Sequence, residues 1–193
     1  MTTADPIAHF HECHARAALR ESFDVTRAAL ATCDTAGRPS LRFVLVKDWN
    51  ERGFVFYTNL ESRKGRELRE NPHAALTFHW GSTGDQVRIE GPVEPVSETE
   101  ADIYFQGRPR GSQLGAWASH QSQPITGRDE LTQRLAELTG RFEGQPVPRP
   151  PFWSGFRLLP ARIEFWHDQP DRLHDRLLYT RTATGWQTSL LSP

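Results

Sequence analysis

The feature that most constrains the fold is a succession of short strand-like segments separated by tight turns. The segments TRAALATCD (26–34), SLRFVLVKDW (40–49) and FVFYTNL (54–60) are separated by TAGRP and ERG. HAALTFHW (73–80) and DQVRIEGPVEPV (85–96) continue the pattern. Short segments that carry β-branched and aromatic residues and are bounded by Gly, Pro or Asn are typical of strands joined by hairpins. We therefore expect an antiparallel sheet built largely from neighbours in the chain.

Helix signals lie between and around these strands. Asp5 and Pro6 are typical of an N-cap and a first helical position, and Ile7, Phe10 and Ala17 follow on one face. Three further helices are expected. The first is SRKGRELRE (62–70), ended by Asn71-Pro72, and the second opens at the capping box SETE (97–100) and runs to about Gly107. The third would be capped by Thr126 with Asp129, and it carries apolar residues at helical spacing: Leu131, Leu135, Leu138 and Phe142.

The C-terminal part of the chain is expected to join the same sheet. EGQPVPRPP (143–151) is rich in Pro, but only about 40 residues follow it, too few for an independent core. We interpret it as a loop, followed by three strand segments: WSGFRLLPARIEFWH, RLHDRLLYTRT and GWQTSLL. The sequence thus predicts one domain over 1–193, mainly β with peripheral helices (α+β), forming a barrel or a strongly curved sheet. Residues 1–20 form its N-terminal helical segment, and residues 151–193 supply the strands that complete it.

Composition excludes several classes of protein. The 193 residues carry a net charge of −1 and the pI is about 6.7, so no overall basic field favours nucleic acid. No apolar run reaches membrane-spanning length, and MTTADPIAHFHE lacks the pattern of a signal peptide. Cys13 and Cys33 form no CxxC pair, which fits a reduced, cytoplasmic setting. The ligand-rich HFHECH would spread its side chains around a helix, so we expect no metal.

A strand-to-helix turn suggests that the protein binds phosphate. In YTNLESRKGRE the helix would begin near Ser62, which places Arg63 and Lys64 in its first turn. Cations at a helix N-terminus oppose the helix dipole, but they become favourable when a phosphate binds there. The alternative is an exposed helix with solvated basic residues. The segment contains neither a GxxxxGK nor a GxGxxG pattern, so it predicts neither a P-loop nor a Rossmann site.

Three other segments place cations close together. RFVLVK would carry Arg42 on one face of a strand and Lys47 on the other. YFQGRPRGSQLGAWASHQS combines Arg108 and Arg110 with tyrosine and serine hydroxyls, a set that suits a phosphate. DRLHDRLLY, if it were a strand, would align the alternate residues Arg172, His174 and Arg176 on one face and require an anion there. Solvated strand and helix ends are the alternative for the first two, but together the clusters favour one or two planar, phosphorylated ligands.

The same segments resemble the pyridoxine (pyridoxamine) 5′-phosphate oxidase family. The matching stretches are RFVLVK, FVFYTNLESRKGREL, DQVRIEGPVE, YFQGRPRGSQLGAWASHQS, FWSGFRL and IEFWHDQPDRLHDRLLY, in family order over roughly nine-tenths of the chain. The resemblance implies an FMN-dependent homodimer with an antiparallel split β-barrel. It also implies hydride transfer from substrate C4′ to flavin N5 and reoxidation by O₂ to hydrogen peroxide. The product would be pyridoxal 5′-phosphate, formed in vitamin B6 biosynthesis or salvage, and no nucleic acid or membrane would be involved.

The resemblance also implies a role for particular residues. Arg42, Arg63 and Lys64 would hold the FMN phosphate and its surroundings, and the further FMN contacts would be Lys47, Tyr57, Thr58, Gln86, Gln121, Ser122, Trp166 and Arg176. Some of these would come from the partner subunit, with FMN at the interface. The substrate phosphate would be bound by Lys47, Tyr104, Arg108 and Ser112. Arg172 and His174 would lie over the substrate ring as the catalytic pair, and Arg176 would stabilise negative charge on the flavin.

Two alternatives remain open at this level. Family members often carry an N-terminal Arg-x-x-Tyr-type lid, which we expect to be absent here or replaced by part of residues 1–20. That leaves room for a related flavin oxidase that acts on another substrate, such as a phenazine precursor. A non-catalytic protein that binds FMN or pyridoxal phosphate is the other alternative, although such a protein would not need the substrate set at 104–112 and 172–174.

Overall fold

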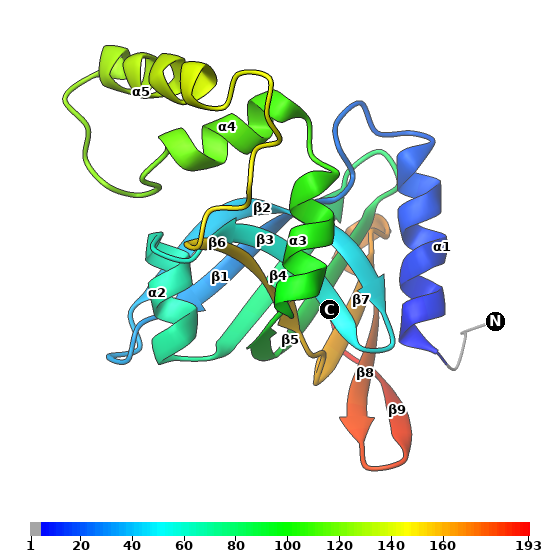
Figure 1. Cartoon of the computed structure of the whole chain (residues 1–193). Helices are drawn as coiled ribbons and strands as arrows, with labels where there is room; N and C mark the ends of the chain where they lie inside the picture. Colours follow the sequence, from blue (N-terminus) through cyan, green and yellow to red (C-terminus); the bar gives the residue numbers. More distant parts are fainter. Residues whose placement is uncertain (1–4) are drawn as a thin grey trace.

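The computed structural model describes residues 5–193, and within them the chain forms five α-helices and nine strands (Figure 1). The helices are α1 (Pro6–Ala18), α2 (Arg63–Glu70), α3 (Glu98–Gln106), α4 (Arg110–Ala118) and α5 (Arg128–Arg141). The strands are β1 (Arg27–Cys33), β2 (Pro39–Asn50), β3 (Gly53–Asn59), β4 (His73–Trp80), β5 (Asp85–Pro95), β6 (Trp153–Leu158), β7 (Arg162–His167), β8 (Asp175–Thr182) and β9 (Gly185–Leu190).

Six of these strands close into an antiparallel barrel. The strand order is β4-β1-β2-β3-β6-β5, and β5 pairs back with β4. The first part of β5 pairs with β7 and its last part with β6, so β7, β8 and β9 extend the sheet outside the barrel. This confirms the predicted split β-barrel. β8 and β9 form a hairpin that projects from the body of the molecule, at the red end of the chain in Figure 1.

Gly91 lies where β5 changes partner. A Cβ atom at this position would stand 2.0 Å from the Leu159 carbonyl oxygen in the β6–β7 turn, far inside any normal contact. Only glycine permits this approach of the two backbones. The Leu159 amide in turn donates to the carbonyl of Pro92. The partner change therefore depends on a residue without a side chain.

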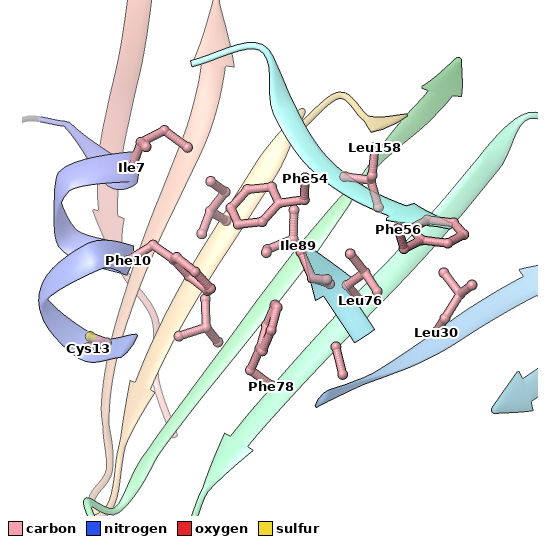
Figure 2. Packing of buried hydrophobic residues seen from close by; sticks show 14 of the residues in the cluster. Ile7, Phe10, Cys13, Leu30, Phe54, Phe56, Leu76, Phe78, Ile89 and Leu158 are labelled. Carbon is pink, nitrogen blue, oxygen red and sulfur yellow. The ribbon is translucent and has the colours of Figure 1, made fainter. Parts of the chain in front are cut away.

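The main core fills the barrel and one side of it is closed by α1. Ile7, Phe10 and Ala17 are buried, as the helical spacing predicts, and Asp5 accepts a hydrogen bond from the Ile7 amide as the N-cap. Phe10 lies edge-on to Phe54 from β3, with the ring centres 5.0 Å apart (Figure 2). Burial of such aromatic and aliphatic side chains supplies most of the stabilisation of the barrel.

The strand and helix boundaries before residue 107 follow the sequence closely. The predicted helix over 62–70 is α2 with Ser62 as its N-cap, and Ser97 and Glu100 form the capping box of α3. The cap predicted for α5 is wrong: Gly127 is the N-cap, and Thr126 bonds to Glu130 rather than to Asp129. The α4 helix was not predicted.

The C-terminal segments differ more from the prediction. The first of the three expected strands is two strands, β6 and β7, because the Leu159–Ala161 turn contains Pro160. The expected alternation of Arg172, His174 and Arg176 along one strand is wrong. Residues 170–172 form a 3₁₀ turn in which Asp171 and Arg172 have positive φ (58° and 62°), and β8 begins only at Asp175. Of the three cations, only Arg176 lies on the strand.

Candidate functional site

A cavity of about 810 Å³ lies between β2, β3, the start of α2 and the α3–α4 region. It collects most of the residues that the resemblance singles out. Eleven of them line it: Arg42, Lys47, Tyr57, Thr58, Arg63, Lys64, Tyr104, Arg108, Ser112, Gln121 and Ser122. These positions come from six different stretches of the chain, so the barrel brings together clusters that the sequence shows apart.

One end of the cavity is a group of cations around a single carboxylate. Glu67 of α2 pairs with Arg63 one turn earlier (2.8 Å) and with Arg42 of β2 (3.3 Å). Burial of Glu67 raises the pKa of its carboxyl, but hydrogen bonds from Ser40, Thr32 and Arg63 and the charge of Arg42 outweigh burial and lower the pKa to about 2. Glu67 is therefore ionised and fixes both guanidiniums.

Lys64 adds a third cation that has no such partner. Its side chain is buried (8% exposed), and within residues 5–193 no carboxylate pairs with it. The Lys64 ammonium instead donates to the oxygens of Thr58 (3.1 Å), Ser62 (3.3 Å) and Gln121 (2.9 Å). Burial, and then the charge of Arg42, lower the pKa of Lys64 to about 8. A buried cation held only by neutral oxygens is costly, and a bound anion would relieve that cost.

The backbone of this corner adds to the preference for an anion. The α2 helix begins at Arg63, so its free N–H groups point toward the same corner. Gly65 permits a close contact here, since a Cβ would lie 2.3 Å from the Leu60 carbonyl oxygen. Three cations against one carboxylate leave an excess of two positive charges beside the helix N-terminus. This corner matches a phosphate dianion in charge and in donors.

Arg108 marks a second cationic subsite in the lining of the cavity. Arg108 lies over the Trp153 ring, 4.8 Å from its centre, and its buried Nη1 has no hydrogen-bond partner among residues 5–193. Tyr104 and Ser112 also line the cavity. Lys47, at a β-bulge between Val46 and Asp48, pairs with Asp24 at 3.7 Å. Arg110 is not part of this subsite, because it donates to the carbonyls of Phe142 and Gln145.

Aromatic rings line the same cavity. Tyr57 and Tyr104 stack with their ring centres 3.9 Å apart, and Trp153 lies parallel to Tyr57 at 5.5 Å. Burial, followed by the charges of Glu100 and Tyr104, raises the pKa of Tyr57 to about 12, so its hydroxyl remains a hydrogen-bond donor at neutral pH. The cavity thus combines flat aromatic surfaces with two cationic subsites.

The remaining predicted site residues lie elsewhere in this chain. Gln86, Trp166 and Arg176 line a second cavity of about 570 Å³ between α1, β5, β7 and β8. Arg176 is held by the buried Glu164 at 2.8 Å. His174 packs against the Trp166 ring with the centres 4.5 Å apart, whereas Arg172 lies in the 3₁₀ turn. The single chain therefore divides the predicted residues into two groups, with the eleven in the first cavity and five around β7 and β8.

Comparison with known proteins shows matches over both parts of the chain that carry these residues. Residues 15–142 match the model described as pyridoxamine 5′-phosphate oxidase, and residues 153–193 match the pyridoxine 5′-phosphate oxidase C-terminal dimerisation region. The chain belongs to the pyridoxamine 5′-phosphate oxidase family. Four of the five residues of the second group lie within the dimerisation region, all except Gln86, and the match to this region supports a homodimer.

Individual relatives extend over the whole chain. A pyridoxine/pyridoxamine 5′-phosphate oxidase of Myxococcus xanthus is 56% identical over 193 residues, covering 100% of this chain and 94% of that protein. One from Rhodospirillum rubrum is 56% identical over 98% of this chain and 96% of its own length. Among solved structures, PhzG from Burkholderia lata 383, in complex with tetrahydrophenazine-1-carboxylic acid, has a TM-score of 0.92 at 37% identity, covering 99% of this chain and 94% of that one.

Sequence reasoning missed the acidic residues that organise these cations. Glu67 stands four positions after Arg63 on a predicted helix, a spacing that brings side chains together, so it could have been found. Glu164 and Asp24 offered no comparable signal, because their partners come from other strands. Within residues 5–193, no three His, Cys, Asp or Glu side chains are grouped to hold a metal ion, and no helix there is long and apolar enough to cross a membrane.

Proposed function

We propose that the protein oxidises pyridoxine 5′-phosphate or pyridoxamine 5′-phosphate to pyridoxal 5′-phosphate with FMN as its cofactor. The observation that carries this proposal is the presence of two cationic subsites in one aromatic-lined cavity of about 810 Å³. One phosphorylated ligand needs only one such subsite, whereas a flavin phosphate and a substrate phosphate need two. The names of the relatives, at 52–56% identity, support the same substrates.

The residues of the first subsite suit the FMN phosphate. Arg63 and Lys64 supply charge beside the α2 N-terminus, and Arg42 is fixed by Glu67 in the same corner. The under-compensated, buried ammonium of Lys64 is the specific sign of fit, since its pKa is lowered only while no anion is bound nearby. Thr58 and Gln121 already contact Lys64 and are placed to complete the shell of hydrogen bonds.

The second subsite suits the phosphate of a B6 vitamer. The unpartnered Nη1 of Arg108 is the sign of fit there, because a buried guanidinium nitrogen without an acceptor is costly. The phenol and hydroxyl groups of Tyr104 and Ser112 would donate to the same phosphate, and Lys47 would add charge. With its phosphate bound in this subsite, the substrate would lie with its ring flat against the cofactor. The cavity walls would exclude water.

The second group of residues would complete the cavity of the partner subunit. Arg172, His174 and Arg176 lie in the dimerisation region and outside the first cavity of their own chain. Bound FMN would accept a hydride from the substrate and pass the electrons to O₂. Arg176 would place positive charge beside the flavin ring, Arg172 would orient the oxygen or nitrogen at the reacting carbon, and His174 would hold or move its proton.

One observation favours a second candidate. The structural similarity to PhzG, a protein solved with a tricyclic acid, is as high as a TM-score of 0.92. A flavin oxidase of the same fold that acts on a phenazine precursor would use the first subsite unchanged. It would have no need of the Tyr104, Arg108 and Ser112 set for a second phosphate.

The test is turnover by purified protein saturated with FMN. We expect the protein to be yellow. With either B6 phosphate and O₂ it should form the aldehyde, detected by its absorbance, together with hydrogen peroxide. Arg108→Ala should raise KM for the phosphorylated substrate far more than it changes FMN content. Turnover of a tricyclic substrate alone would select the second candidate. Tight FMN binding without substrate-dependent O₂ consumption would refute both and leave a flavin-binding protein.

A further inference from the structure

The His174 ring nitrogen Nδ1 has two neighbours that make opposite demands on it. The backbone amide of Gln169 donates a hydrogen bond to Nδ1 at 3.2 Å. A carboxylate oxygen of Asp168 lies 3.1 Å from the same Nδ1. Both partners come from the short segment between β7 and β8 that also carries Arg172.

One nitrogen cannot serve both partners at once. When the imidazole is neutral and Nδ1 accepts from Gln169, the ring proton must lie on Nε2. When the imidazole takes up a second proton, Nδ1 becomes a donor and can no longer accept from the amide. The Asp168 carboxylate is the acceptor within reach. Protonation therefore exchanges one partner for the other without moving the ring far.

We propose that Asp168 is a positioning residue for His174, which stabilises the imidazolium while the Gln169 amide stabilises the neutral, Nε2-protonated ring. The inference rests on the proposed function only for the role of His174 in moving a substrate proton. A histidine that has a hydrogen-bond partner in each protonation state can give and take a proton at Nε2 while its orientation is kept by Nδ1.

The groups around the His174 ring indicate that this exchange of hydrogen-bond partners is its main local response to protonation. Within residues 5–193, the ring contacts Asp168, Gln169 and the Trp166 indole. Asp175, the next residue, accepts from the Gln169 side chain at 2.6 Å, and its strand neighbour His167 is held by Asp85 at 2.8 Å. The other charged groups of the segment are Asp171 and Arg172 in the 3₁₀ turn.

The exchange would also reach Arg172. Gln169 immediately precedes the turn in which Asp171 and Arg172 adopt positive φ, an uncommon conformation for residues with side chains. Protonation of His174 frees the Gln169 amide, whereas the bond from the Gln169 side chain to Asp175 holds the turn closed in both states. Protonation of His174 would therefore change the hydrogen bonding of the peptide that leads into the turn of Arg172, while the turn itself stays in place.

The test is the titration of His174 by NMR in the FMN-loaded dimer, with the signal assigned by its loss in His174→Gln. In Asp168→Asn we expect a lower midpoint than in the unmodified protein, because the charged partner of the imidazolium is lost. The Gln169 amide resonance of the unmodified protein should shift with the same midpoint as the ring. Asp171→Asn is the matched control: it removes an equal charge from the same β7–β8 segment, at a position where Asn tolerates positive φ.

The outcomes separate this proposal from the proposed function. An unchanged midpoint in Asp168→Asn, or an equal fall in Asp171→Asn, would overturn the pairing and leave Asp168 as a neighbouring surface charge. A selective fall in a protein that oxidises no B6 phosphate would support the pairing and refute the function. In an active enzyme, the acidic limb of the pH profile of kcat/KM should move to lower pH in Asp168→Asn by the same amount as the titration.

Discussion

Replacement of Lys64 by methionine should stabilise the FMN-free protein although it removes three hydrogen bonds. The pKa of Lys64 is lowered from 10.5 to about 8, first by burial and then by Arg42. At about 1.4 kcal/mol per pKa unit, this corresponds to roughly 3 kcal/mol of unfavourable free energy at pH 7, where the ammonium is charged in both the folded and the unfolded chain. Methionine has a similar length and carries no charge.

The groups that Lys64 contacts would keep other partners. Thr58 donates to the Gln121 side chain at 3.1 Å, and the Ser62 hydroxyl accepts from the Gly65 amide at 3.2 Å. The gain on substitution should therefore be a substantial part of the full amount, about 1–3 kcal/mol in the free energy of unfolding. FMN binding should change in the opposite direction, with a loss of roughly 10- to 100-fold in affinity, because our proposal assigns Lys64 a charged hydrogen bond to the FMN phosphate.

Urea unfolding of the FMN-free proteins at pH 7 and pH 10 measures this effect. The folded wild-type chain releases the Lys64 proton near pH 8, whereas the unfolded chain keeps it to about 10.5. The free energy of unfolding of the wild type should therefore rise relative to that of Lys64→Met between pH 7 and pH 10. The stability difference between the two proteins should be smaller at pH 10 than at pH 7. Lys47→Met is the control, since Lys47 lies in the same cavity but has a carboxylate partner. A Lys64→Met protein that is less stable at pH 7, with no convergence at pH 10, would refute the reasoning.

Three further predictions concern the two subsites and the barrel. Arg63→Ala should lower FMN content far more than turnover per bound flavin, and Arg172→Ala should do the reverse; equal loss of FMN in both would contradict the division of roles. Wild-type stability should fall by roughly 3 kcal/mol between about pH 4.5 and pH 2 from protonation of Glu67, whose pKa is about 2, and this part of the acid dependence should be missing in Glu67→Gln. Gly91→Ala should cost about 3 kcal/mol or more in urea unfolding because its Cβ would meet a backbone carbonyl at 2.0 Å, whereas Gly140→Ala, with open space around it, should not destabilise.

The elements before residue 107 were predictable because local signals agree with the fold. Ser62 caps α2 and Ser97 caps α3, Gly37 and Gly84 lie in turns between strands, and Asn71-Pro72 separates α2 from β4. Helix α4 was missed because Gly111 and Gly115 weaken its helical pattern. Tertiary contacts compensate, since the Gln113 side chain donates to the carbonyl of Phe105 and Leu114 is buried.

The error at Arg172 and His174 has a physical cause that the sequence contained. Alternation predicted a strand, but Gln169-Pro170-Asp171 is a turn signal, because Pro fixes φ and Asp tolerates positive φ. The turn points these residues in directions that no strand would give. Their grouping apart from the first cavity could not be predicted from periodicity at all, because it depends on a sheet extension and, in our proposal, on a second subunit.

The chemistry of the site was more predictable than its geometry. Cations at the start of a helix after a strand indicated an anion, and the structure places Arg63 and Lys64 in one cavity with Arg42. The pairing of Arg42 with Glu67, and the contact of Lys64 with Gln121, join residues far apart in the chain. Such contacts follow from the closed barrel and have no local signature.

The most direct test of the composite site is subunit mixing. Arg108→Ala damages the first cavity and Arg172→Ala damages the turn from the dimerisation region, so each homodimer should be nearly inactive at low substrate concentration. If each site combines the cavity of one chain with the turn of its partner, a mixed dimer contains one intact site. Random re-association should then restore about a quarter of the wild-type activity. If both residues serve the same chain's site, every site in the mixed dimer keeps one defect, and mixing should restore nothing.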